Sequence, residues 1–180
     1  DMTTTLRILS TSPELEEGNL RAFHERTQRS LLSNALYVLA VDAEGMQLLN
    51  TRVPFGTPLR RMSDTAALEA ALETRVTHVS DVFFGATSGQ FVFNVTMPLS
   101  EEMARSSGAA ALVVTQNASE LQKLISPDAL PPQWSVAITD GAGKIITSIG
   151  ASKTSPISAF HEDTVRLMTD INGTNENVGE

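Results

Sequence analysis

The sequence predicts an α+β fold, in which a long N-terminal helix and a five-stranded antiparallel sheet flanked by helices precede part of a second, similar unit. Three observations support this class. Hydrophobic residues follow helix and strand periodicities in the order helix, hairpin, helix and three strands. A second hairpin repeats the first at a fixed offset. With 180 residues, 41% hydrophobic and 19% charged, the chain is long enough for one domain and part of another.

The first 34 residues are predicted to form a helical stem. Ser12-Pro13-Glu14 is a typical helix start, with a Ser cap, Pro at the first helical position and an acidic residue in the first turn. Gly18-Asn19 indicates a break and a second cap. The apolar face that follows has helical spacing and consists of Leu20, Phe23, Thr27 and Leu31.

A hairpin and a second helix follow the stem. Residues 36–41 are almost wholly apolar, Asp42-Ala43-Glu44-Gly45 is a turn, and residues 46–51 form the return strand. Pro54 and Pro58 exclude regular structure from the next loop, because proline lacks the backbone donor. Ser63-Asp64 then caps a helix that is expected at residues 65–75.

Three more strands are expected at residues 77–84, 90–98 and 109–115. The first two are joined by Gly85-Ala86-Thr87-Ser88-Gly89, a hairpin-type connection. A short helix at residues 119–125 follows. We therefore predict a helical stem at residues 1–34, a first unit at 35–118 and a partial second unit at 119–180.

The partial second unit is inferred from a repeat. Asp42 and Asp140, like Gly45 and Gly143, are 98 positions apart. Such turns are common between strands, so coincidence is one explanation, but the flanking elements also repeat in order, including a helical stretch at residues 157–171. The second unit lacks the three closing strands, and a lone two-stranded ribbon is marginally stable. It is therefore either truncated or completed elsewhere.

Composition and motifs exclude several function classes. The net charge of -8 argues against a nucleic-acid partner, and the absence of Cys excludes thiol nucleophiles, disulfides and Cys zinc sites. No apolar run of membrane-spanning length occurs, and no signal peptide is expected, because no basic segment followed by an apolar one opens the sequence. His24, His78 and His161 are far apart, and each is expected at a surface or helix flank. No catalytic residue, metal site or cofactor is therefore predicted.

Several strings of the sequence resemble one group of bacterial sensor domains. They are Ser12-Pro13-Glu14-Leu15, Phe23-His24, the loop from Leu49 to Leu59, and Val79-Ser80-Asp81-Val82-Phe83. The loop, with Asn-Thr-Arg-Val-Pro-Phe-Gly-Thr-Pro-Leu, is the most specific of them. Over residues 6–150 the chain is similar to PAS-like extracellular sensor domains, called PDC or Cache domains, and the strings resemble the periplasmic parts of membrane histidine kinases with two tandem units. Beyond residue 150 the sequence departs from the usual second unit.

The resemblance implies a periplasmic segment of an inner-membrane protein, with membrane anchors outside this sequence. It would bind a small ligand and signal to a cytoplasmic histidine kinase, so this fragment itself is not expected to be an enzyme. The alternatives are the same module in a chemoreceptor or cyclic-nucleotide signalling protein, and a module that only dimerises. The receptor is expected to be a homodimer through the N-terminal helix, whose apolar face either forms the dimer or packs on its own domain.

The resemblance also places a ligand site between the sheet and the loop and helix that follow the first hairpin. The guanidinium of Arg52 suits a carboxylate or phosphate, or alternatively pairs with Asp81 and holds the loop. Tyr37 offers a hydroxyl or belongs to the core, and Phe55 is a candidate lid. The candidate ligand-binding residues are Tyr37, Asn50, Thr51, Arg52, Phe55, Asp81, Phe83, Asn94 and Thr96.

Overall fold

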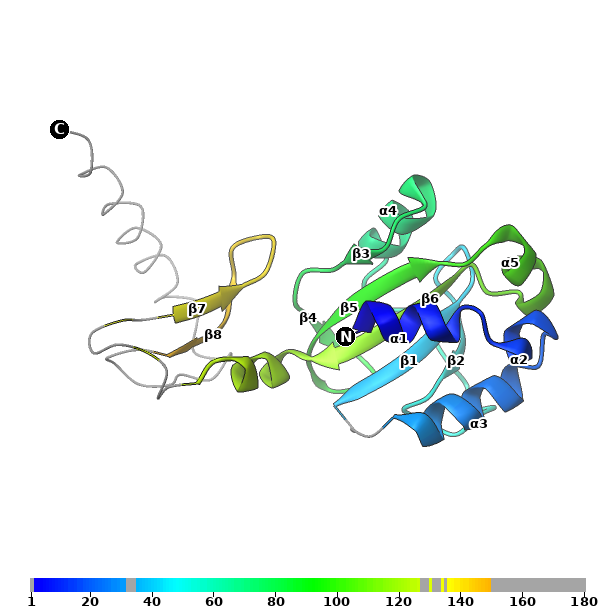
Figure 1. Cartoon of the computed structure of the whole chain (residues 1–180), viewed down its shortest axis with the longest axis horizontal. Helices are drawn as coiled ribbons and strands as arrows, with labels where there is room; N and C mark the ends of the chain where they lie inside the picture. The colour runs from blue at the N-terminus through cyan, green and yellow to red at the C-terminus, as the bar shows by residue number, and fades with distance from the viewer. Residues whose placement is uncertain (1, 32–34, 127–129, 131–133, 135, 150–180) are drawn as a thin grey trace. The chain divides into compact units, whose positions relative to one another are not determined.

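Figure 1 shows the computed structural model of the chain, which describes residues 2–31, 35–126, 130, 134 and 136–149. The fold class is confirmed, because the chain contains an antiparallel sheet flanked by helices. Two compact units are present, Asp1–Asn117 and Ala118–Glu180. The helix predicted at residues 157–171 lies outside the described residues.

The first unit is built on one antiparallel sheet. Its strands are β1 (Leu36–Val41), β2 (Gln47–Asn50), β3 (His78–Val79), β4 (Phe83–Gly85), β5 (Gln90–Pro98) and β6 (Ala111–Asn117). The order across the sheet is β2-β1-β6-β5-β3, and β4 also pairs with β5. β1 and β6 run in unbroken register from Leu36 opposite Gln116 to Val41 opposite Ala111. Alternate residues of these strands therefore point to opposite faces.

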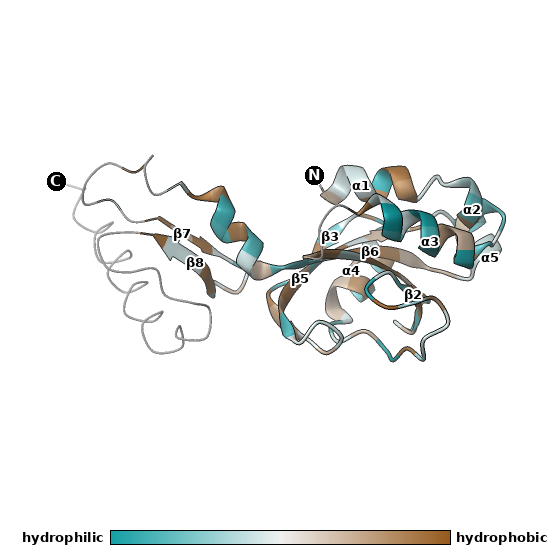
Figure 2. Cartoon of the chain, turned by 90° about the horizontal axis from the view of Figure 1, so that it is seen from below, coloured by the Kyte–Doolittle hydropathy of each residue, from teal (hydrophilic) through white to brown (hydrophobic). Residues whose placement is uncertain are grey.

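The two faces of the sheet bury different clusters, and Figure 2 shows helices on both sides. The α1 face is covered by the N-terminal helices, and Val38, Ala40 and Val114 pack there with Leu6 and Phe23. The opposite side, which we call the α4 face, carries α4 (Ala66–Thr74). Its core consists of Tyr37, Leu39, Val41, Met62, Leu68, Ala111 and Val113.

The N-terminal segment forms three helices rather than one long helix, and the predicted break and cap at Gly18-Asn19 are present. They are α1 (Met2–Leu9), α2 (Pro13–Glu16) and α3 (Leu20–Ser30). Ser12 is extended before Pro13, and Gly18 adopts a left-handed φ of 70°, so the chain turns at both positions. Asn19 caps α3 by accepting a hydrogen bond from the backbone of Ala22 at 3.1 Å. These turns let successive helices lie on the α1 face.

Two further features differ from the prediction. Helix α5 (Glu101–Ser107), which was not predicted, lies between β5 and β6 and is capped by Ser100, whose side chain accepts from the Met103 backbone. The strand predicted at residues 77–84 is divided into β3 and β4. Between them, the Asn94 N–H donates to the Ser80 side-chain oxygen at 2.9 Å, so a hydroxyl takes the place of a backbone carbonyl and interrupts the ladder.

The second unit contains η1 (Ala118–Leu124), β7 (Val136–Thr139) and β8 (Ile145–Ile149). The β7–β8 turn has the same geometry as the β1–β2 turn. Asp42 Oδ1 accepts from Met46 N at 2.8 Å, and Asp140 Oδ1 accepts from Lys144 N at 2.8 Å. The turn glycines have φ values of 83° and 81°. A register shift precedes each turn. The sequence repeat is therefore also a repeat of hairpin geometry.

Gly18 provides a test of how α2 and α5 meet. A Cβ at Gly18 would lie 2.5 Å from the backbone oxygen of Ser106, whereas a Cβ at Gly56 would meet nothing within 4 Å. Both glycines have positive φ, 70° and 90°. We expect Gly18→Ala to lower the free energy of unfolding by about 1–3 kcal/mol more than Gly56→Ala.

Urea denaturation followed by circular dichroism measures both variants. Equal losses in the two would show that only the backbone conformation matters and would contradict the close contact.

Candidate functional site

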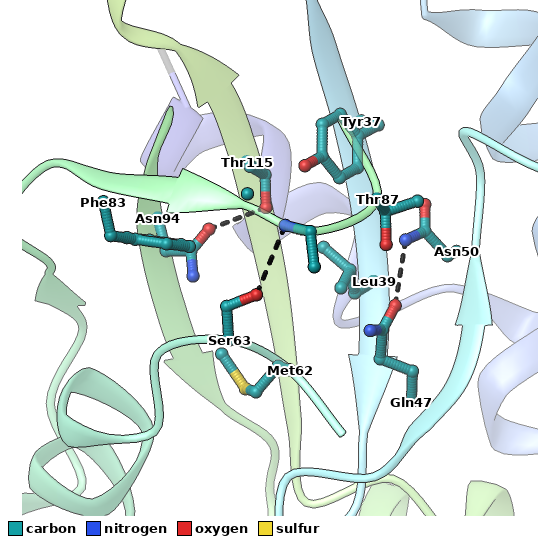
Figure 3. A pocket seen from close by; sticks show the side chains of 12 residues that line it. Tyr37, Leu39, Gln47, Asn50, Met62, Ser63, Phe83, Thr87, Asn94 and Thr115 are labelled. Carbon is teal, nitrogen blue, oxygen red and sulfur yellow. Dashed lines mark hydrogen bonds between the residues drawn. The ribbon is translucent and has the colours of Figure 1, made fainter. Parts of the chain in front are cut away.

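A small cavity opens on the α4 face of the first unit (Figure 3). The space open to the centre of a water molecule is about 20 Å³, which is room for roughly one water. Its walls come from β1, β2, β4, β5 and β6, together with the loop before α4 and the β4–β5 connection. The lining residues are Tyr37, Leu39, Gln47, Asn50, Met62, Ser63, Phe83, Gly85, Ala86, Thr87, Asn94 and Thr115.

The polar side chains of the cavity are held by hydrogen bonds to one another. The Thr115 hydroxyl donates to Asn94 Oδ1 at 2.7 Å, and both residues are buried. Asn50 Nδ2 donates to Gln47 Oε1 at 2.9 Å. Figure 3 shows these two pairs on opposite sides of the cavity. Because each pair is internally bonded, the walls are preorganised.

Strand register places three of the polar side chains of the cavity. Thr115 lies opposite Tyr37 on one side and opposite Asn94 on the other. Side chains of directly paired residues lie on the same face and within reach of each other. The sheet therefore brings a phenol, a hydroxyl and an amide into one row across β1, β6 and β5.

Tyr37 is a buried titratable group in the cavity wall. Burial raises the pKa of its phenol above 10.0, while a hydrogen bond with Ser88, the positive charge of Arg52 and a hydrogen bond with Thr115 act in the opposite direction. The Arg52 guanidinium carbon lies 5.3 Å from the centre of the Tyr37 ring, which is a cation–π distance. Tyr37 therefore presents a protonated hydroxyl at neutral pH.

The structure brings four of the nine predicted site residues together around the cavity. These are Tyr37, Asn50, Phe83 and Asn94. Arg52 is outside the lining but contacts the ring of Tyr37. Whether any of them binds a ligand stays a prediction.

The other four candidates lie elsewhere. Thr51 is buried, and its hydroxyl accepts from the backbone N–H of Val38 at 2.9 Å. Thr96 is fully buried and does not line the cavity, and Asp81 is exposed outside the lining.

The expectation that Phe55 forms a lid does not fit its position. Its ring packs against the α1-face cluster, with its centre 5.6 Å from that of His24 and 4.8 Å from the Arg21 guanidinium carbon. The apolar side chain in the loop therefore contacts α3 rather than covering the cavity on the α4 face. His24 was expected at a surface or helix flank, but it lies on the buried side of α3, with 1% of its surface exposed.

Sequence reasoning missed several lining residues. Thr115 had a usable signal, because it follows Val113 by two positions in a strand and would share its face. Ser63, Ala86 and Thr87 come from loops whose approach to the sheet depends on tertiary packing. Ala86 N–H, for example, donates to Ser63 Oγ at 3.4 Å across 23 positions of the chain.

The chemistry of the lining suits binding. It consists of amide, hydroxyl, aromatic and aliphatic groups, the combination that orients small ligands in pockets. Across the described ranges, no three His, Asp or Glu side chains are grouped so that they could hold a metal ion. Among these same residues, no helix has the length and apolar character needed to cross a membrane.

No family model matches the chain, and no curated protein does. Solved structures do match. The sensory domain of the Campylobacter jejuni chemoreceptor Tlp3 with isoleucine bound has a TM-score of 0.54 at 16% identity, over 87% of this chain and 67% of that one. The ligand-binding domain of the same receptor with 4-methylisoleucine has a TM-score of 0.53 at 17% identity, over 79% of this chain and 59% of that one. The extracellular domain of the histidine kinase rpHK1S-Z16 has a TM-score of 0.52 at 15% identity, over 86% of this chain and 62% of that one.

At these identities the likeness shows the fold. An antiparallel sheet flanked by helices matches PDC/Cache-like sensor domains, as the resemblance predicted. The chain spans only 59% of the receptor domain solved with 4-methylisoleucine and 62% of the kinase domain.

The pKa of Tyr37 provides a direct test of the cavity. Tyr37 is the only tyrosine, so the absorbance of its phenolate reports this residue alone. We expect the titration midpoint of the folded chain to lie above 10.0 and to fall to about 10 in urea. Because the fold favours the protonated form, its contribution to stability is present below about pH 10 and is lost as the pH rises through the folded-state pKa.

The Tyr37→Phe variant supplies the blank for this titration. A midpoint at or below the usual value in the folded chain would show that the phenol is solvated.

Proposed function

We propose that this chain is the ligand-sensing segment of a bacterial membrane receptor and lies outside the cytoplasm. The observation that carries the proposal is the polar-lined cavity on the α4 face, in a fold shared with ligand-binding sensory domains. The sequence strings favour a two-component histidine kinase as the parent protein. The neighbours support a kinase and a chemoreceptor equally, so a chemoreceptor is the second candidate.

The proposed signal starts at the segment that joins β2 to the following loop. Asn50 lines the cavity, while its backbone oxygen lies 3.1 Å from His24 Nε2 in α3. The same His24 nitrogen lies 2.9 Å from the backbone oxygen of Val53. Gln28, one turn further along α3, donates to the backbone oxygen of Thr51 at 2.8 Å. One short segment therefore contacts the cavity and an N-terminal helix at once.

The mechanism that we propose is a population shift. A ligand that bonds with Asn50 or Gln47 favours one position of this segment, and α3 follows because its side chains hold the segment's carbonyl groups. The ligand moves the equilibrium only as far as its affinities for the two positions differ. Displacement of α3 would then be the output that the receptor reads.

Dimerisation of the receptor is a separate proposal. Leu6, Leu9 and Phe23 are buried in the α1-face cluster, so this apolar stripe packs on its own sheet. A homodimer through the N-terminal helices would therefore use their outer surfaces, where Ile8 is 65% exposed.

Thermal-shift screening of the chain tests the proposed function. We expect at least one class among amino acids, small carboxylates, polyols and sugars to raise the melting temperature. At about 100 times its Kd, a ligand stabilises the folded state by about 2.7 kcal/mol. Asn94→Ala should weaken this stabilisation, and the control Gln90→Ala, at an exposed position outside the lining, should not.

Failure of every class to stabilise the wild-type chain would contradict a sensing role. It would leave the module that only dimerises as the better interpretation.

The link between cavity and helix predicts a separation of binding from signalling. In a chimaera that joins this chain to a histidine kinase with a reporter gene, Gln28→Ala should leave the Kd within about twofold. It should reduce the ligand-dependent output, because α3 loses its bond to Thr51. The matched control is Glu25→Ala, at an exposed position on the same helix. It should change neither the Kd nor the ligand-dependent output. An unchanged response in Gln28→Ala would contradict this route.

A further inference from the structure

We infer that the ligand of the α4-face cavity is a small uncharged polyol or sugar. The inference rests on the proposed function, since it names the ligand class of the same site. It depends on three features: the charge of the lining, the direction of its hydrogen bonds, and its aromatic groups.

The lining is uncharged. Its twelve residues include three side-chain amides, three aliphatic hydroxyls and one phenol, and no Asp, Glu, Lys, Arg or His. An ammonium or carboxylate buried without a counter-ion loses several kcal/mol of hydration. An α-amino acid carries both charges, so this lining offers neither of the partners that it needs.

Arg52 provides a positive charge beside Tyr37. Its guanidinium lies over the Tyr37 ring and outside the lining. A carboxylate ligand would have to bind beyond the cavity wall to reach this side chain directly. The geometry therefore favours an uncharged ligand over an anion.

The internal hydrogen bonds determine what the walls offer to a ligand. Asn94 uses Oδ1 to accept from Thr115, and Gln47 uses Oε1 to accept from Asn50. Asn94 and Gln47 can therefore offer amide N–H donors, and Thr115, which also bonds with Tyr37, can offer the remaining lone pair of its oxygen. A hydroxyl group both donates and accepts, so the hydroxyls of a polyol can pair with both kinds of group.

Aromatic groups complete the match. Tyr37 from β1 and Phe83 from β4 contribute rings to opposite parts of the lining. The faces of sugar rings carry C–H groups, which remove apolar surface from water when they pack on aromatic side chains.

Entry requires the β4–β5 connection to move. A space of about 20 Å³ holds roughly one water, so residues 85–89 must shift outward to admit a polyol. The Ala86 N–H to Ser63 Oγ contact, at 3.4 Å, is long for a hydrogen bond. This connection is exposed at Ala86 and Thr87, so its displacement costs little buried surface.

Calorimetric titration of the 180-residue chain tests the ligand class. The probes are glycerol, D-ribose, D-glucose and myo-inositol as uncharged compounds, L-isoleucine and L-valine as amino acids, and lactate and succinate as carboxylates. We expect an uncharged probe to bind most tightly. Asn94→Ala and Gln47→Ala should each weaken it about tenfold, while Gln90→Ala should not.

Asn94→Asp provides a second variant that keeps the side-chain shape and an oxygen for the Thr115 hydroxyl. It places a negative charge in the wall, so it should weaken the uncharged probe and improve the relative binding of a compound with an ammonium group. This variant keeps the test meaningful if Asn94→Ala fails to fold.

The outcomes separate this inference from the proposed function. Tightest binding by an amino acid or a carboxylate would overturn the ligand class and leave the sensing role intact. Binding by none of the three classes would overturn both. If an uncharged probe binds with the same affinity to the wild-type chain, Asn94→Ala and Gln47→Ala, its site lies elsewhere and the inference is overturned.

Discussion

The side-chain alternation of β1, β6 and β5 is the constraint on which the first unit depends. Each strand of a sheet sends successive residues to opposite faces, and the unbroken β1–β6 register carries this alternation across the sheet. Val38 and Ala40 thereby join the helices on one face, and Tyr37 and Leu39 join the cavity side on the other. A shift of one residue would exchange the two sets. Cavity and helix packing are therefore specified by the same register.

The segment at Asn50–Val53 links these two faces. Thr51 holds it to β1 through its hydroxyl, and His24 and Gln28 hold it to α3 through its carbonyl groups. The Asn50 side chain remains on the cavity side. The string that resembles sensor kinases thus has a packing role at Thr51 and Phe55 and a role in the cavity wall at Asn50.

Much of the fold followed from local patterns, and less of the site did. The hairpin at residues 36–51 and the helix at residues 65–75 could be predicted because apolar runs, an Asp–Gly turn and the Ser63-Asp64 pair are local signals. The predicted cap is only partly right: the N-cap residue is Thr65, Asp64 Oδ1 accepts from Ala66 N at 3.1 Å, and Ser63 bonds the β4–β5 connection instead. Helix α5 was missed, although Ser100 followed by Glu101 and Glu102 is a typical helix start. The division of the third predicted strand depends on Ser80 meeting Asn94, which no local pattern shows. Tyr37 and Asn94 were identified as candidates, whereas Ser63 and Thr87 reach the cavity only through tertiary packing.

The central claim is that a small molecule binds in the α4-face cavity. Proton–nitrogen NMR of the labelled chain tests it most directly, since the side-chain amides of Asn94, Gln47 and Asn50 give signals of their own. Addition of the tightest ligand should shift these three signals and leave the exposed amide of Gln90 unchanged. A ligand that binds the chain but leaves the amides of Asn94 and Gln47 unshifted would contradict the account.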